Sequence, residues 1–281
     1  MKYCTNQKFL NVHKPEGWRA RVRNVARTIF GKLSNAMIGI LCATLFGFFT
    51  HALAADKPVL KAVTADSNFP YNFVKNNQIQ GISIDVAHAL ADRIGYQLTL
   101  ELVPWTRALY TAKHTKSVMA FSVARIPERE GDYHWIGPIA TNEVWLYKLR
   151  SRPEISVKKI EDAREFLIGD EASNANIPLL TRFGIKVDTA PSMLSNCRKF
   201  KMGRVDLVPF EPEGVAAFLR ECGLSMQQVE RVILLPRNEG LYIVLGRATP
   251  PELIARLQTE FALIVKDKTL VSIKEKWNLR Q

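Results

Sequence analysis

The chain has 281 residues, of which 47% are hydrophobic and 23% are charged, so it can bury a large core. Its formal net charge at pH 7 is +12, but the first 54 residues hold eight basic side chains and one acidic side chain. That segment therefore carries +7 and the rest of the chain only +5, a charge that needs no nucleic-acid partner to explain it.

The first 54 residues have the layout of a secretory signal peptide. Basic residues come first, an apolar run follows at 36–49, and small residues close the segment. A membrane anchor is the alternative, but the apolar run is shorter than the ~20 residues that span a bilayer and is interrupted by glycine. We therefore expect residues 1–54 to be removed by cleavage between Ala54 and Ala55, and the remaining chain to be exported to the periplasm.

Two of the four cysteines, Cys197 and Cys222, lie outside the predicted signal peptide. In an oxidising compartment such a pair can form a disulfide. Closing the loop between them would stabilise the fold by roughly 3 kcal/mol in the chain-entropy model. Two buried free thiols explain the pair equally well, so the sequence leaves both states open.

Strands and helices alternate in the first part of the exported chain, which predicts an α/β fold. Strands are expected at 59–65, 98–103, 118–123 and 142–149, and helices at 86–94 and 105–113. The polar, aromatic loop 66–72 follows the first strand, where α/β proteins often contact ligands. Trp105 opens the second helix and either stacks on a ligand or packs in the core.

A change in composition at 150–153 marks the start of a second α/β unit. Its strands are expected at 165–169, 203–210 and 232–235, and its helices at 175–183, 193–202 and 215–222. Ser173 and Asn174 precede the first of these helices, so they either cap it or help to bind an anion there. Glu211 follows a buried strand and either pairs with a ligand's ammonium group or caps the next helix.

The chain then returns through a strand expected at 241–245 and ends in two helices, expected at 250–266 and 270–277. No metal-ligand spacing, Gly-rich phosphate loop or hydrolase motif is present in the sequence. The histidines of the exported chain, His88, His114 and His134, lie in three different elements and form no nucleophile–base pattern. The sequence therefore predicts neither a metal site nor a cofactor.

Arg125 and Arg129 are the strongest anion-binding candidates, because they follow an apolar strand in a loop. A guanidinium presents a planar set of donors that can hold a carboxylate with two hydrogen bonds. The alternative is a solvated, charged turn, since Glu128, Glu130 and Asp132 alternate with the arginines and could neutralise them.

Several separated segments together resemble the family-3 extracellular solute-binding proteins, the amino-acid-type periplasmic receptors of ABC importers. The matching segments, in the family's order, are Phe69-Pro70-Tyr71-Asn72-Phe73, Gly81-Ile82-Ser83-Ile84-Asp85, Trp105-Thr106-Arg107, Pro127-Glu128-Arg129-Glu130 with Trp135, Gly203-Arg204-Val205-Asp206, and Pro250-Pro251-Glu252-Leu253 with Glu275-Lys276-Trp277. They cover nearly all of the exported chain, and it is their ordered combination that is specific.

The resemblance implies a two-lobed periplasmic-binding-protein type II fold with two crossing strands and a ligand enclosed between the lobes. Lobe one would comprise residues 55–148 and 244–281, and lobe two residues 149–243. The protein would be a monomer that passes its ligand to an ABC permease, or to a sensor, in the inner membrane.

By the same resemblance, Arg129 would bind the α-carboxylate of an amino acid, with Arg125 as a neighbour. The other lobe-one contacts would be Asn68, Tyr71, Trp105 and Ser122. Lobe two would contribute Ser173, Asn174 and Glu211, with Glu211 at the place where the family usually has an aspartate for the α-amino group.

Some positions depart from the family pattern. Ala124 and Ile126 stand where hydroxyl residues are common, and Asn68 stands where an aromatic residue is frequent.

The leading hypothesis is therefore a receptor for an amino acid or a related small carboxylate. The alternatives are a periplasmic enzyme on the same scaffold, resembling the dehydratases of this fold with Glu211 as general acid or base, and a ligand-sensing module.

Overall fold

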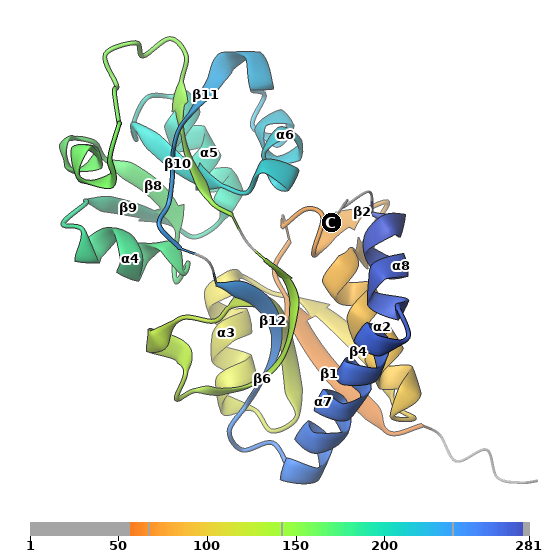
Figure 1. Cartoon of the computed structure of the whole chain (residues 1–281). Helices are drawn as coiled ribbons and strands as arrows, with labels where there is room; N and C mark the ends of the chain where they lie inside the picture. The colour runs from red at the N-terminus through yellow and green to blue at the C-terminus, as the bar shows by residue number, and fades with distance from the viewer. Residues whose placement is uncertain (1–56, 67, 142, 238, 278–281) are drawn as a thin grey trace, which may run out of the picture. The chain divides into compact units, whose positions relative to one another are not determined.

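A computed structural model describes residues 57–66, 68–141, 143–237 and 239–277 (Figure 1). Every described residue lies within the unit formed by residues 57–281. The predicted signal peptide and its cleavage site at Ala54 and Ala55 lie outside the described residues. Among the helices that are described, none is long and apolar enough to cross a membrane.

The first sheet has five strands in the order β4-β1-β5-β12-β6. The strands are β1 (Val59–Thr64), β4 (Gln97–Leu102), β5 (Val118–Ala124), β6 (Tyr133–Thr141) and β12 (Gly240–Gly246). β1 pairs in parallel with β4 and β5, whereas β12 pairs antiparallel with β5 and β6. All seven residues of β5 are buried, as expected of a central strand covered on both faces.

Helices cover both faces of this sheet. On one face lie α2 (Ile82–Arg93), α7 (Pro251–Lys266) and α8 (Thr269–Lys276), which pack around Phe121, Ile136 and Ile243. On the other face α3 (Trp105–His114) buries Ala108, Leu109 and Ala112. Figure 1 shows α3 on the opposite side of the sheet from α2 and α7. A short hairpin, β2 (Phe73–Lys75) and β3 (Gln78–Gln80), connects β1 to α2.

Helix α2 begins at Ile82, several residues before the predicted start, because Gly81 adopts a φ of 134°. A Cβ at Gly81 would lie 2.3 Å from the carbonyl oxygen of Tyr71, so only glycine fits there. The N–H groups of Ile82 and Ser83 donate to the carbonyls of Pro70 and Tyr71 at 3.0 and 2.9 Å. The start of α2 thus holds loop 66–72 at the carboxyl end of β1.

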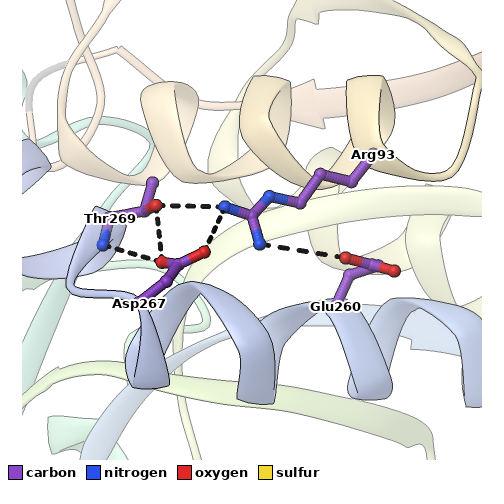
Figure 2. A network of polar contacts seen from close by, with 4 residues as sticks. All are labelled: Arg93, Glu260, Asp267 and Thr269. Carbon is purple, nitrogen blue, oxygen red and sulfur yellow. Dashed lines mark hydrogen bonds and ion pairs between the residues drawn. The ribbon is translucent and has the colours of Figure 1, made fainter.

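A polar network around Arg93, at the end of α2, ties α2 to the two C-terminal helices (Figure 2). Its guanidinium donates to Asp267 at 2.6 Å and to Thr269 at 3.0 Å, between α7 and α8, and lies 3.9 Å from Glu260. Asp267 also accepts from the backbone and hydroxyl of Thr269, and these bonds lower its pKa to about 2. This network joins segments that are far apart in the sequence.

The second sheet has the order β11-β7-β10-β8-β9. Its strands are β7 (Trp145–Leu149), β8 (Ile168–Glu171), β9 (Val187–Ala190), β10 (Leu207–Phe210) and β11 (Val229–Leu234). Helices α5 (Met193–Lys201) and α6 (Pro212–Glu221) pack on one core, and α4 (Asn176–Arg182) packs on another. Three short 3-10 turns complete the fold: η1 (Pro127–Arg129), η2 (Ile160–Glu165) and η3 (Met226–Gln228). The expected two-lobed α/β fold is confirmed.

The strand predicted at 165–169 is displaced. Residues Ile160–Glu165 form η2, and β8 begins only at Ile168. Asp170 and Glu171, which come after the end of the predicted strand, therefore lie within a strand, and Asp170 is completely buried.

The chain passes between the sheets twice, at 142–144 and at 235–239, because β7 belongs to the second sheet and β12 to the first. These positions precede the expected lobe boundaries at 148/149 and 243/244 by several residues. The two passages are hydrogen bonded to each other, since the N–H of Leu235 donates to the carbonyl of Val144 at 2.8 Å. Asn142 and Asn238 lie outside the described residues.

Cys197 on α5 and Cys222 at the end of α6 are joined by a disulfide in this structure. Their Cα atoms are 6.0 Å apart, within the usual range for this bond. The bond holds together two helices of the same core, in which Cys197 is fully buried.

Candidate ligand-binding site

A cavity lies between the two sheets, at the carboxyl ends of β1, β5, β8 and β10. It contains about 850 Å³ of space between atoms, counting the part open to solvent. The lining residues are Ala65, Asp66, Asn68, Phe69, Asn72, Trp105, Ser122, Ala124, Arg129, Val144, Glu171, Asn174, Ala175, Asn176, Met193, Pro209, Phe210, Glu211, Gly214, Phe218, Arg237 and Leu241.

Arg129 reaches this cavity from η1, and only 8% of its surface is exposed. Its Nη1 donates to the carbonyl of Ala124 at 3.2 Å, and its Nη2 donates to the carbonyl of Ser173 at 2.6 Å, which belongs to the second lobe. Burial, reinforced by the nearby charge of Arg237, lowers the pKa of Arg129 to about 10. The group therefore remains cationic at neutral pH, and it still has N–H donors beyond the two that these carbonyls use.

Arg125 does not line the cavity, although it is only four positions away. Its guanidinium forms two hydrogen bonds with the carboxylate of Glu130, at 2.7 and 3.1 Å. It also lies over the rings of Trp135 and Tyr242, 5.4 and 5.6 Å from their centres. The solvated, neutralised turn therefore describes Arg125, whereas Arg129 is directed inward by the 3-10 turn.

Three other predicted residues of lobe one, Asn68, Trp105 and Ser122, line the cavity. Tyr71 does not, because its side chain is 3% exposed and belongs to the core beneath loop 66–72. Burial, together with the charges of Glu213 and Glu211, raises the pKa of Tyr71 well above its ordinary value.

Ser122 is the centre of a small network on the lobe-one side. Its backbone has a φ of 54°, where β5 and β12 lose their regular register. Its hydroxyl donates to Oδ1 of Asn72 at 2.6 Å and accepts from the hydroxyl of Ser83 at 2.8 Å. Asn72 in turn donates to the carbonyl of Ala65 at 2.9 Å. A left-handed, non-glycine residue of this kind is typical of functional sites.

The loop after β8 brings the second lobe into contact with the first. Besides the bond from Arg129 to its carbonyl, the Ser173 hydroxyl lies 3.2 Å from the hydroxyl of Thr106. Thr106 also donates to the carbonyl of Ala172 at 3.4 Å. Ser173 has a φ of 66° and lines a smaller neighbouring pocket rather than the main cavity. Its role in the structure is thus to connect the lobes.

Asn174 and Glu211 line the main cavity from lobe two, as the resemblance implies. Glu211 occupies the N-cap position of α6, whereas Asn174 lies one residue before the N-cap of α4. The cap of α4 is Ala175, and Glu211 stands at the start of α6 without capping it through its side chain. Asn174 accepts a hydrogen bond from the N–H of Asn176 at 3.1 Å.

Sequence reasoning missed a pair of acidic residues on this side of the cavity. Asp170 is completely buried and accepts from the side chain of Asn176 at 3.1 Å and from the N–H of Glu171 at 2.7 Å. Burial raises its pKa to about 7, and burial together with the charge of Asp170 raises the pKa of Glu171 to about 8. Glu171 is therefore mainly protonated at neutral pH, and it lines the cavity.

Arg237 was also missed, although it lines the cavity and its side chain is only 2% exposed. It lies in the second passage between the sheets, a segment whose sequence gave no periodic signal. Among the described residues, no group of His, Cys, Asp and Glu side chains could hold a metal ion.

The comparisons with known proteins agree with this geometry. The family model for bacterial extracellular solute-binding proteins, family 3, matches residues 60–280. The chain belongs to this family. Family 3 proteins are extracellular solute-binding proteins, which implies a location outside the cytoplasm. A comparison with curated protein sequences finds no significant match.

Solved structures with the same fold include receptors, a sensor and a precursor of an enzyme. An ancestral arginine-binding protein bound to arginine has a TM-score of 0.69 and 19% identity, over 79% of this chain and 99% of that chain. A histidine kinase sensor domain with similarity to periplasmic binding proteins has a TM-score of 0.70 and 17% identity, over 80% of this chain and 97% of that chain. An ancestral amino-acid-binding protein, a precursor of cyclohexadienyl dehydratase, has a TM-score of 0.65 and 20% identity, over 78% of this chain and 95% of that chain. At these identities the likeness establishes the fold.

Proposed function

We propose that this family 3 protein is a monomeric periplasmic receptor that binds an amino acid, or a related small carboxylate, between its lobes and delivers it to an ABC importer. The observation that carries this proposal is the guanidinium of Arg129, a buried cation that lines the cavity between the lobes. A carboxylate is the natural partner of such a group, because a guanidinium can hold both of its oxygens.

The opposite wall supports a solute that also carries an ammonium group. Glu211 and Asn174 face the cavity from lobe two, where they offer a carboxylate and an amide oxygen. A solute with both groups would contact Arg129 on one lobe and Glu211 on the other. Binding would then favour the closed arrangement, since only that arrangement provides both sets of contacts.

The lobes already meet around the cavity. Arg129 and Thr106 of lobe one contact the loop that carries Ser173, and Arg182 of lobe two donates to Glu128 at 3.0 Å. A solute held in this arrangement would be largely shielded from water. Shielding strengthens charge-assisted hydrogen bonds, so even a small solute could be bound tightly.

The test is a thermal-shift screen of the purified chain without its first 54 residues against the standard amino acids and small carboxylates. A ligand at 100 times its Kd adds about 2.7 kcal/mol to the free energy of unfolding, which is easily detected as a higher Tm. We expect at least one amino acid or carboxylate to raise the Tm in proportion to the logarithm of its concentration. If none does so up to millimolar concentrations, the proposal fails.

One observation favours a second candidate function, a periplasmic enzyme on the same scaffold. Glu171 is a carboxyl group in the cavity whose raised pKa keeps it protonated at neutral pH, as a general acid requires. Together with Glu211 it would form an acid–base pair. Incubating the protein with each ligand found in the screen, followed by NMR of the small molecule, distinguishes the two functions. A receptor returns the ligand unchanged, whereas an enzyme converts it and loses this activity in Glu211→Gln or Glu171→Gln.

A further inference from the structure

We infer that Arg237 is a second cationic anchor in the cavity, so that the preferred solute carries two acidic groups, one at Arg129 and one at Arg237. This inference rests on the proposed receptor function and specifies the class of solute. An amino acid with an acidic side chain has the required groups: two carboxylates and one ammonium.

The first support is the position and burial of Arg237. It lines the cavity from the passage between β11 and β12, and its side chain is 2% exposed. Its Nε donates to Glu239 at 2.9 Å, and its Nη1 donates to Oδ1 of Asn176. These two bonds fix the plane of the guanidinium relative to the loop after β8.

The second support is that Nη2 of Arg237 is buried and has no hydrogen-bond partner in the described part of the chain. The guanidinium is paired with Glu239 through Nε and bonded to Asn176 through Nη1, but a buried N–H donor without an acceptor is unfavourable, because it has lost its hydrogen bond to water. A carboxylate or other anion of the solute would supply the missing acceptor. The remainder of the side chain is already held in place, so little further ordering is needed.

The third support is the electrostatic relation between the two arginines. Arg129 and Arg237 line the same cavity, and the charge of Arg237 contributes to the lowered pKa of Arg129. Within the described residues, Arg129 forms no ion pair with a carboxylate within 4.0 Å. Glu239 already pairs with Nε of Arg237, so a solute with two negative groups would add one acceptor at Nη2 of Arg237 and one at Arg129, whereas a single carboxylate would supply only one of them.

The acidic residues of the cavity do not reverse the preference for a solute with two acidic groups. Burial raises the pKa of Glu171 to about 8, so at neutral pH this side chain is mainly neutral and can donate a hydrogen bond to a solute oxygen. Asp170 lies behind the cavity wall and is held by Asn176. Glu211 also lines the cavity, where its carboxylate would face the ammonium group of the same solute.

The experiment compares pairs of solutes that differ only in one acidic group. Isothermal titration at pH 7 measures the affinity of the purified protein for L-glutamate, L-aspartate, L-glutamine, L-asparagine and L-arginine. We expect an acidic amino acid to bind at least about tenfold more tightly than its amide and than arginine. In Arg237→Gln we expect this ratio to fall to about one, through weaker binding of the acidic member and little change for the amide.

The outcomes separate the two proposals. If an amide or arginine binds as tightly as the acidic amino acids, the second anchor is wrong and the receptor function stands. If Arg237→Gln weakens the acidic amino acid and its amide equally, Arg237 only braces the site and the inference fails. If none of the five solutes binds, and no compound in the thermal-shift screen does, the receptor function itself fails. If Arg237→Gln does not fold, Arg237→Lys replaces it in the experiment. This variant keeps the charge and should retain part of the preference for the acidic amino acid.

Discussion

The two walls of the cavity differ in charge. The lobe-one wall holds the buried guanidinium of Arg129 beside the neutral network of Ser122 and Asn72, with Asp66 as its acidic member. The lobe-two wall holds the carboxyls of Glu171 and Glu211, and the guanidinium of Arg237 lines the cavity from the second passage between the sheets. An amino acid can place a carboxylate at Arg129 and its ammonium group at Glu211 in only one orientation. The difference therefore suggests that the site selects both the charges of the solute and the direction in which it lies.

The largest effect is expected from removing the cation of the lobe-one wall. In Arg129→Met the solute's carboxylate would be enclosed without its partner, which typically costs about 3–5 kcal/mol. Affinity for the ligand found in the screen should fall by at least about 100-fold, measured by isothermal titration.

Arg125→Met is the matched control, because it removes the same kind of side chain four positions away and outside the cavity. It should leave the Kd within about twofold, even though it breaks the pair with Glu130. Equal losses in the two variants would show that the buried position of Arg129 has no special role.

A smaller effect is expected from neutralising the lobe-two wall. Glu211→Gln keeps the shape of the side chain but removes the charge that would face the ammonium group, a change worth about 1.5–3 kcal/mol. The affinity for the amino acid should fall about 10-fold to 100-fold. The α-hydroxy acid with the same side chain has no ammonium group, so its affinity should change little. If both compounds weaken to the same extent, Glu211 has another role.

The smallest of these effects concerns the pH dependence of folding. The pKa of Glu171 is raised to about 8 in the folded protein, from about 4.5, chiefly by burial. The folded state thus holds a proton that the unfolded state has released, so the free energy of unfolding falls as the pH rises from about 4.5 to about 8.

Glu171→Gln should remove this contribution. Between pH 5 and pH 8, we expect the free energy of unfolding of the variant to rise by roughly 2 kcal/mol relative to that of the original chain. The full pKa difference would give a larger value, but the cavity admits solvent, which weakens the effect. Urea unfolding of both chains at the two pH values measures this difference in the free energy of unfolding. A difference that does not change with pH would mean that Glu171 is ionised in the folded state.

Much of the site could be predicted because its residues follow strands, and strand ends are visible in the sequence as limits of apolar runs. Arg129, Trp105 and Ser122 were found in this way or through the family resemblance. The sequence could not distinguish Arg125 from Arg129 by composition. What separates them is the 3-10 turn at Pro127, which directs one guanidinium inward and leaves the other beside Glu130.

The second lobe was harder to predict, for a local reason. Residues 160–171 contain one short 3-10 turn and one four-residue strand, and neither is long enough to produce a clear periodic pattern. A displacement of the predicted strand by only a few residues placed Asp170 and Glu171 after its end and hid their burial. Arg237 lies in a segment without regular structure, so only the three-dimensional fold brings it to the cavity.

The central claim is that the cavity holds an acidic group of the solute against Arg129. A crystal structure of the protein with its tightest ligand from the screen tests this directly. We expect a carboxylate of the ligand within hydrogen-bond distance of the Arg129 guanidinium, with any ammonium group directed toward Glu211. A ligand whose carboxylate points away from Arg129, or one bound outside the cavity, would contradict the account.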